Sequence, residues 1–193
     1  MDIKAGDVIA FSGDGGISFV VNILSYGVPW VSISHLGIMG EHEGELLIFE
    51  STTLSNVPCV IQGESIEGVQ AVRLKDRVEK YDGKVFHYPL VEPLFGGGKR
   101  KLNKFLYDQV GKEYDLIGAL RAGGKIWAWL EAQLREEDLN FLFCSELVAA
   151  SLQRVGRLET DSASRWNPNQ LIRHGLKTNI LHKPRRLTCE DSF

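Results

Sequence analysis

One cysteine and one histidine occupy the most regular segments of this chain, and together they have the chemistry of a nucleophile and its base. Cys144 lies in the tetrad Phe-Cys-Ser-Glu at residues 143–146, beside a stretch with helical periodicity. His35 lies in the run Ser-His-Leu-Gly-Ile-Met at residues 34–39, which is typical of a β-strand. Such partners meet in space and not in the sequence, so their separation along the chain is no obstacle.

The pattern around Cys144 predicts that the sulfur lies at the start of a helix. The apolar residues that recur at helical spacing after it are Leu147, Val148, Leu152 and Val155. In the first turn of a helix the thiolate is favoured over the thiol. The backbone N–H of Cys144 would there be available to an oxyanion, and Ser145 would be a capping or solvent-facing residue.

Glu50 is the candidate for the third group that an activated thiol requires, a polar residue that orients the base. The runs 34–39 and 46–51 have the pattern of two hairpin strands, joined by a polar turn over residues 40–45. On neighbouring strands, the Glu50 carboxylate can accept the second N–H of the His35 ring and fix its tautomer.

Each of these residues also has an interpretation without chemistry. An isolated helical cysteine is commonly a small buried hydrophobe, and a strand histidine is often a core group bonded to a carbonyl. Glu50 would then mark the exit of an apolar strand into solvent. Rival motifs are weaker, because the glycine-rich segment 118–126 lacks the magnesium-binding hydroxyl of a phosphate-binding loop. The other histidines show no metal-ligand spacing.

The remaining pattern predicts how these residues are positioned. Further strands are expected at residues 7–11, 69–74 and 84–88, and a charged stretch over 75–82 separates the last two. Helices are expected at about 17–26, 102–110 and 167–171. The three glycines at 96–98 are interpreted as a flexible surface loop. Strands grouped before helices favour an α+β fold, and we expect residues 1–193 to form a single domain.

Composition excludes several classes of function. A net charge of −3 gives no bulk attraction for nucleic acid, and no apolar run approaches the roughly 18 residues of a membrane span. The N-terminus lacks the layout of a secretory signal, so the expected compartment is the cytoplasm by default, with export that uses no classical signal as the alternative. Three widely separated cysteines suggest neither a disulfide framework nor a zinc site. No metal or organic cofactor is expected, and the sequence does not indicate an oligomeric state.

The order of four short motifs resembles that of a known family. They are Gly-Asp-Val-Ile at 6–9, Ser-His-Leu-Gly-Ile at 34–38, Phe-Glu-Ser at 49–51 and Phe-Cys-Ser-Glu-Leu-Val at 143–148. This combination, with the histidine before the cysteine, resembles the circularly permuted branch of the NlpC/P60 cysteine peptidase superfamily, and within it the YiiX/YebB-like group. Gly-Lys-Glu-Tyr-Asp at 111–115 and Asn-Pro at 167–168 are similar to further family segments.

The resemblance implies a permuted papain-like fold, in which a small antiparallel sheet or half-barrel carries the histidine and packs on the cysteine helix. By motif it implies Cys144 as nucleophile, His35 as base and Glu50 as the third polar residue. Tyr114 is implied to line the site, and further candidates for contact with a substrate are Ser12, Ser34 and Ser145. The Trp- and Glu-rich stretch from about 125 to 139 has no role in the family pattern.

Three functions follow as hypotheses. The first is a cysteine hydrolase that cleaves an amide bond in a peptide or peptidoglycan-type fragment through a thioester. The second is an acyltransferase or a lipid ester or thioester hydrolase that uses the same Cys/His site on an acyl-bearing substrate. The third is a binding module that keeps the scaffold without catalysis.

Overall fold

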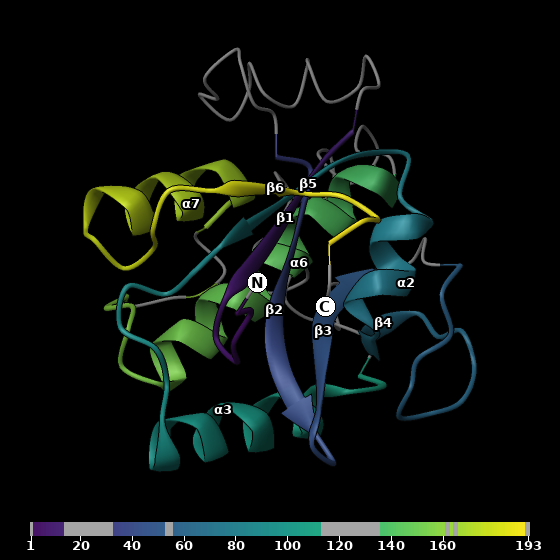
Figure 1. Ribbon diagram of the computed structural model, residues 1–193, viewed down its shortest axis with the longest axis horizontal. Coiled ribbons are helices and arrows are strands. Elements are labelled where there is room, and N and C mark those ends of the chain that lie inside the picture. Colours follow the sequence, from purple (N-terminus) through teal and green to yellow (C-terminus); the bar gives the residue numbers. More distant parts are fainter. Residues whose placement is uncertain are drawn as a thin grey trace, which may run out of the picture.

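The fold is a mixed α/β structure built on one open antiparallel sheet (Figure 1). The computed structural model describes residues 2–13, 33–52, 56–112, 136–160, 163 and 166–191. The sheet has the strand order β4-β3-β2-β1-β5-β6. In chain order these strands are β1 (Val8–Gly13), β2 (His35–His42), β3 (Glu45–Thr52), β4 (Gly68–Val72), β5 (Gly83–Tyr88) and β6 (Arg185–Leu187). The described helices are α2 (Leu74–Glu79), α3 (Gly96–Gln109), α6 (Glu136–Arg154) and α7 (Pro168–Lys177).

The hairpin of β2 and β3 forms as the sequence predicts, but its turn is much shorter than residues 40–45. His42 pairs with Glu45 in the ladder, so only Glu43 and Gly44 connect the strands. Both have positive φ angles, 51° and 84°, which is the conformation of the two-residue turns that match the twist of a hairpin. The predicted polar turn is therefore too long at both ends, because Gly40 to His42 and Glu45 have ladder partners.

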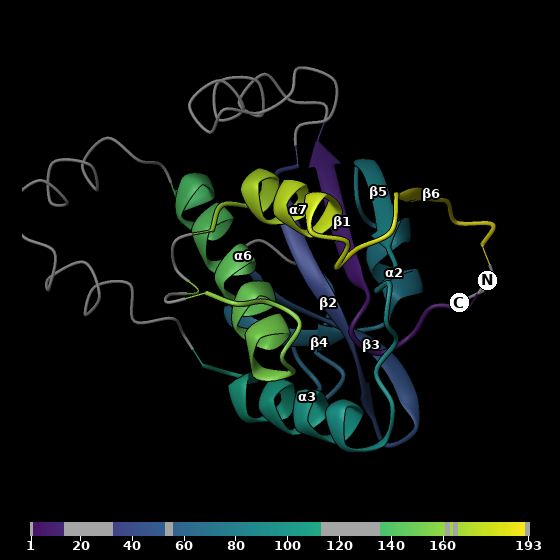
Figure 2. The same cartoon turned by 90° about the vertical axis from the view of Figure 1, so that its left-hand side faces the viewer.

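Helices cover both faces of the sheet. Alternate strand residues, such as Ala10, Leu36 and Phe49, pack in one core with α6, α3 and α7. Their neighbours Ile9 and Ile48 join a second core with α2 on the opposite face. Figure 2 shows α6 on one side of the sheet and α2 on the other. A strand buried on both faces needs apolar residues in succession, as β1 and β3 have.

Helix α2 corrects the interpretation of residues 75–82 as a charged separator. Leu74 and Val78 lie one turn apart and are both buried, so they anchor a short helix whose charged residues lie between them. Leu74, expected at the end of a strand, therefore begins this helix instead. The consequence is that Arg77, which lies between the two anchors, is brought against Glu50 of β3.

Helix α3 begins earlier than predicted, whereas its end and the start of α7 agree with the predictions. The glycines at 96–98, expected as a flexible loop, form the first turn of α3. Gly111, with φ of 76°, follows the end of that helix as predicted. The predicted start of the helix at 167–171 is confirmed, because the side chains of Asn167 and Gln170 form a reciprocal capping box at the start of α7. The helix predicted at 17–26 lies outside the described residues.

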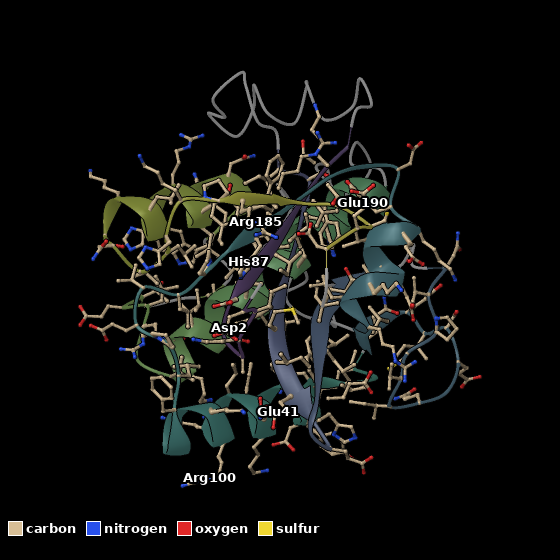
Figure 3. The ribbon with its side chains drawn as sticks, viewed as in Figure 1. Asp2, Glu41, His87, Arg100, Arg185 and Glu190 are labelled. Carbon is tan, nitrogen blue, oxygen red and sulfur yellow. The ribbon has the colours of Figure 1, made fainter. Side chains whose placement is uncertain are left out.

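None of the helices in the described ranges combines the length and apolar character needed to cross a bilayer. The basic cluster at 99–101 lies on α3, where Arg100 and Lys101 are exposed. Figure 3 shows Arg100 at the outer edge of the molecule, whereas His87 lies near its middle.

Candidate functional site

His35 and Glu50 are brought together by the register of the hairpin. Gly37 of β2 pairs with Glu50 of β3, so His35, two residues earlier, lies diagonally across from Glu50 on the same face. The Nε2–H of His35 donates to Oε2 of Glu50 over 2.7 Å. The predicted contact between these two residues is confirmed.

Glu50 is fully buried and bonded on both oxygens. Its Oε1 accepts hydrogen bonds from Gln70 Nε2 at 2.9 Å and from Arg77 Nε at 2.7 Å. Gln70 lies opposite Glu50 in the ladder of β3 and β4, and Arg77 comes from α2. Because Glu50 is 0% exposed, it does not mark the exit of a strand into solvent. Neither Gln70 nor Arg77 was singled out by the sequence.

The charge of Glu50 is maintained by these partners. Burial alone raises the pKa of this carboxyl, but the positive charge of Arg77 and the bonds from His35 and Gln70 outweigh it and lower the pKa to about 2. Glu50 is therefore an anion at neutral pH despite having no contact with solvent.

Arg77 is held by two aromatic rings. Its guanidinium carbon lies 4.7 Å from the centroid of the Phe11 ring and 5.3 Å from that of Tyr81, distances at which a cation is attracted to the ring face. The Phe11 ring in turn lies 5.4 Å from the His35 ring. The cation, the carboxylate and the imidazole therefore pack around one aromatic side chain.

Cys144 interacts with His35 from the other side. Burial lowers the pKa of His35, but the charge of Cys144, a hydrogen bond between the two side chains, and the contacts with Glu50 together raise it to about 9. Because Nε2 is bonded to Glu50, the other ring nitrogen, Nδ1, is left for the sulfur. Figure 2 shows the start of β2 and the first half of α6 at the same end of the molecule.

The prediction that Cys144 lies in the first turn of its helix is wrong. Helix α6 begins at Glu136, two turns before the cysteine, because the intervening residues include good helix formers. The backbone N–H of Cys144 therefore takes part in the helix ladder. Neither a free oxyanion donor nor the favourable field of a helix N-terminus is available at this position.

Cys144 and Ser145 are both buried. Cys144 is 0% exposed and packs in the core that contains α6, α3 and α7, while the His35 side chain is 11% exposed. Solvent therefore reaches the pair through the imidazole. Ser145, predicted as capping or solvent-facing, is buried, and its hydroxyl donates to the carbonyl of Trp166 at 2.5 Å. It ties α6 to the segment before α7.

Of the other residues predicted to contact a substrate, Ser34 lies beside the site, and Ser12 lies within the sheet. Ser34 adjoins the site, because its hydroxyl donates to the Phe11 carbonyl at 3.2 Å and lies 3.4 Å from the Tyr81 hydroxyl. Ser12 is buried in β1, opposite Lys84 of β5. Tyr114 lies outside the described residues, as does most of the stretch from 125 to 139, of which the last four residues belong to α6.

The structure is similar to the crystal structure of the metalloprotein YiiX from Escherichia coli O157:H7, DUF1105. The TM-score is 0.50 at 16% identity, and the match covers 95% of this chain and 88% of that chain. At this identity the similarity shows a shared fold. No family model and no curated protein matches the sequence.

The residues described here do not form a metal site of the usual kind. In the described ranges, no group of three or more His, Cys, Asp or Glu residues is arranged to hold a metal ion. His35 is bonded to Glu50, and the buried His87 donates from Nε2 to Asp7 Oδ2 at 2.7 Å. The donor sets of the described residues therefore do not fit a metal ion.

Proposed function

We propose that this chain is a cysteine hydrolase in which Cys144 is the nucleophile, His35 the base and Glu50 the group that orients the base. The observation that carries the proposal is the chain of side-chain contacts from Cys144 to His35 and on to the buried Glu50. An imidazole between a thiol and a carboxylate is the arrangement by which proteins activate a thiol. The motif order and the fold shared with YiiX support placing the chain with the permuted NlpC/P60 hydrolases.

The reaction begins with an ion pair of thiolate and imidazolium. The sulfur of Cys144 attacks the substrate carbonyl carbon, a carbon–sulfur bond forms, and the carbonyl oxygen becomes an oxyanion. As the carbon–nitrogen bond breaks, the His35 ring gives its Nδ1 proton to the departing amine. Water then attacks the thioester and gives a proton to His35. The carbon–sulfur bond breaks, the acid leaves, and the thiolate is regenerated.

Glu50 contributes by keeping the imidazole charged and oriented. Its carboxylate accepts the Nε2–H over 2.7 Å, so the ring cannot turn without breaking a buried charge-assisted bond. The substrate class proposed is an amide in a peptide or peptidoglycan-type fragment, on the basis of the family resemblance. The proposal requires the carbonyl to approach at the His35 side of the pair, where the imidazole is 11% exposed.

Thiol labelling tests the proposal with a control in the same chain. Cys59 and Cys144 are both 0% exposed, but Cys59 accepts a hydrogen bond from the backbone N–H of Ala71 and Cys144 contacts His35. We expect iodoacetamide at pH 7 to label Cys144 at least about tenfold faster than Cys59, because the thiolate is the reactive species. Mass mapping of the labelled peptides measures both rates in one sample.

Equal, slow labelling of the two buried cysteines would contradict the proposal and favour the inert binding module. The H35Q variant should remove the difference between them. Hydrolysis of peptide amides and peptidoglycan fragments is then assayed. The wild type and the control C59A should hydrolyse the substrate, and C144A should not. Transfer of the acyl group to an added amine or alcohol in place of water would indicate the acyltransferase alternative.

A further inference from the structure

Helix α2 brings a charge to the candidate site that the motif pattern does not contain. Arg77 donates from Nε to Oε1 of Glu50 at 2.7 Å, while His35 occupies Oε2. The Arg77 side chain is 12% exposed and the Glu50 side chain 0%. Opposite charges that are removed from water interact far more strongly than a surface pair.

We propose that Arg77 is a positioning residue: it holds Glu50 as an anion against the Nε2–H of His35 and thereby keeps Nδ1 facing Cys144. This inference rests on the proposed function for its consequence in catalysis, but the contacts themselves do not depend on it. With the proposed thiolate and imidazolium, the guanidinium, carboxylate, imidazolium and thiolate form a row in which the charge alternates in sign. Each member stabilises the charged form of the next.

The structure around the guanidinium explains why this residue is an arginine. Its flat group fits against the faces of Phe11 and Tyr81, at 4.7 and 5.3 Å from their centroids. Phe11 also contacts the His35 ring at 5.4 Å. A lysine carries the same charge as a compact ammonium group, without the planar stacking and the fixed fork of donors. Arg77 is therefore fixed in direction as well as in charge.

Without Arg77, the balance at Glu50 moves toward the protonated carboxyl. Burial is the largest influence on the pKa of Glu50 and raises it, whereas the charge of Arg77 is the largest influence that lowers it. Loss of the arginine therefore favours a protonated Glu50. A neutral carboxyl no longer supports the imidazolium, so the pKa of His35 falls.

In the described ranges, the charged and titratable side chains around His35 and Arg77 come from four segments of the chain. Glu50 comes from β3, Cys144 from α6, Arg77 from α2, and Tyr81 from the segment after α2. Tyr81 contacts the guanidinium through its ring, and its hydroxyl lies 3.4 Å from that of Ser34. Arg77 is the cation that these contacts bring to the carboxylate.

The test is an NMR titration of the His35 ring, assigned by comparison with H35Q. We expect R77M to lower the pKa of His35 by about one unit or more, and R77K to lower it less, because lysine keeps the charge. The matched control is R73M. Arg73 precedes the same helix and is bonded to Glu45 at 2.7 Å, but its side chain is 54% exposed, and its loss should leave the titration of His35 unchanged.

A double-mutant cycle separates positioning from a general effect on structure. If Arg77 acts through Glu50, R77M should cause no further shift of the His35 titration in an E50Q background. That background also removes the buried unpaired carboxylate, so the comparison is available even where R77M alone folds poorly. An unchanged His35 titration in R77M relative to the wild type, or an equal R77M shift with and without Glu50, would overturn the proposal.

The outcome is independent of the test of catalysis. The titration of His35 is read from the resting protein and requires no substrate. A shift in R77M together with a Cys144 that labels no faster than Cys59 would support the positioning role and reject the hydrolase. Fast labelling of Cys144 together with an unchanged His35 titration in R77M would support the hydrolase and reject the positioning role.

Discussion

The carboxylate of Glu50 is the residue on which the charges of the candidate site depend. It accepts hydrogen bonds from three side chains, contributed by β2, β4 and α2. A buried carboxylate without such donors would be protonated, because the cost of burying a charge is several kcal/mol. With them, the site contains a fixed negative charge that is shielded from solvent and from salt. This arrangement distinguishes Glu50 from an ordinary strand residue.

The two shifted groups predict how stability depends on pH. The pKa of Glu50 lies at about 2 in the folded chain against 4.5 ordinarily, so its contribution is present above pH 4.5 and is lost as the pH falls toward 2. The pKa of His35 is raised from 6.5 to about 9, so its contribution is present below pH 6.5 and is lost as the pH rises through 9. We expect the free energy of unfolding to be largest between about pH 4.5 and 6.5.

Urea unfolding across this pH range measures the effect, and two histidine variants test its origin. H35Q should remove the fall in stability between pH 6.5 and 9. H42Q is the control, because His42 lies near the hairpin tip and stacks on Tyr107 at 5.3 Å; its loss should leave the fall in place. A fall that persists in H35Q would show that another group titrates there.

At the scale of elements, α6 connects the candidate site to the rest of the fold. It packs across β2 and β3 and against α3 and α7. Ser145 lies beside Cys144 and donates to the Trp166 carbonyl at 2.5 Å, so the position of the cysteine turn is coupled to the entry of α7. The capping box at Asn167 then fixes where α7 begins.

We expect S145A to destabilise the protein by about 1–2 kcal/mol, because it leaves the Trp166 carbonyl without this donor in a partly buried region. Ser151 is a matched control in the same helix. It is equally buried, but its hydroxyl donates to the Leu147 carbonyl one turn earlier, which also accepts a bond from the helix ladder. S151A should therefore cost less than about 0.5 kcal/mol. Urea unfolding of both variants measures the difference, and equal effects would show that Ser145 does not couple the two helices.

At the scale of the whole molecule, strands from both ends of the described sequence belong to one sheet, with β6 at its edge. β5 lies between β1 and the C-terminal strand β6, in which Leu187 pairs with Val85. Leu187 is 3% exposed and packs in the same core as α2. The sheet edge, the C-terminal strand and the helix that carries Arg77 therefore belong to one core.

This arrangement predicts that β6 contributes to global stability. We expect L187A to lower the free energy of unfolding by about 2–3 kcal/mol through lost burial and a cavity. The neighbouring R186A, on an exposed residue of the same strand, should change it by less than about 0.5 kcal/mol. Thermal and urea unfolding monitored by circular dichroism give both values. Equal, small effects would indicate that β6 is dispensable for the fold.

The sequence by itself determined the two strands of the hairpin, the placement of His35 and Glu50 on them, and the start of α7. These features depend on alternation, helical spacing and turn residues, which are properties of neighbours along the chain. The joining of Cys144 to His35 was expected from the family resemblance, and its role in catalysis stays a prediction.

Only the tertiary structure decided the rest. The roles of Gln70 and Arg77 follow from long-range packing of β4 and α2 against β3, and a charged residue between two apolar anchors gives no local sign of this contact. The true start of α6 and the helical glycines at 96–98 depend on packing that overrides local propensity. Charge at a buried site is a property of the surrounding partners, so the fixed anion at Glu50 appears only when segments far apart in the sequence meet.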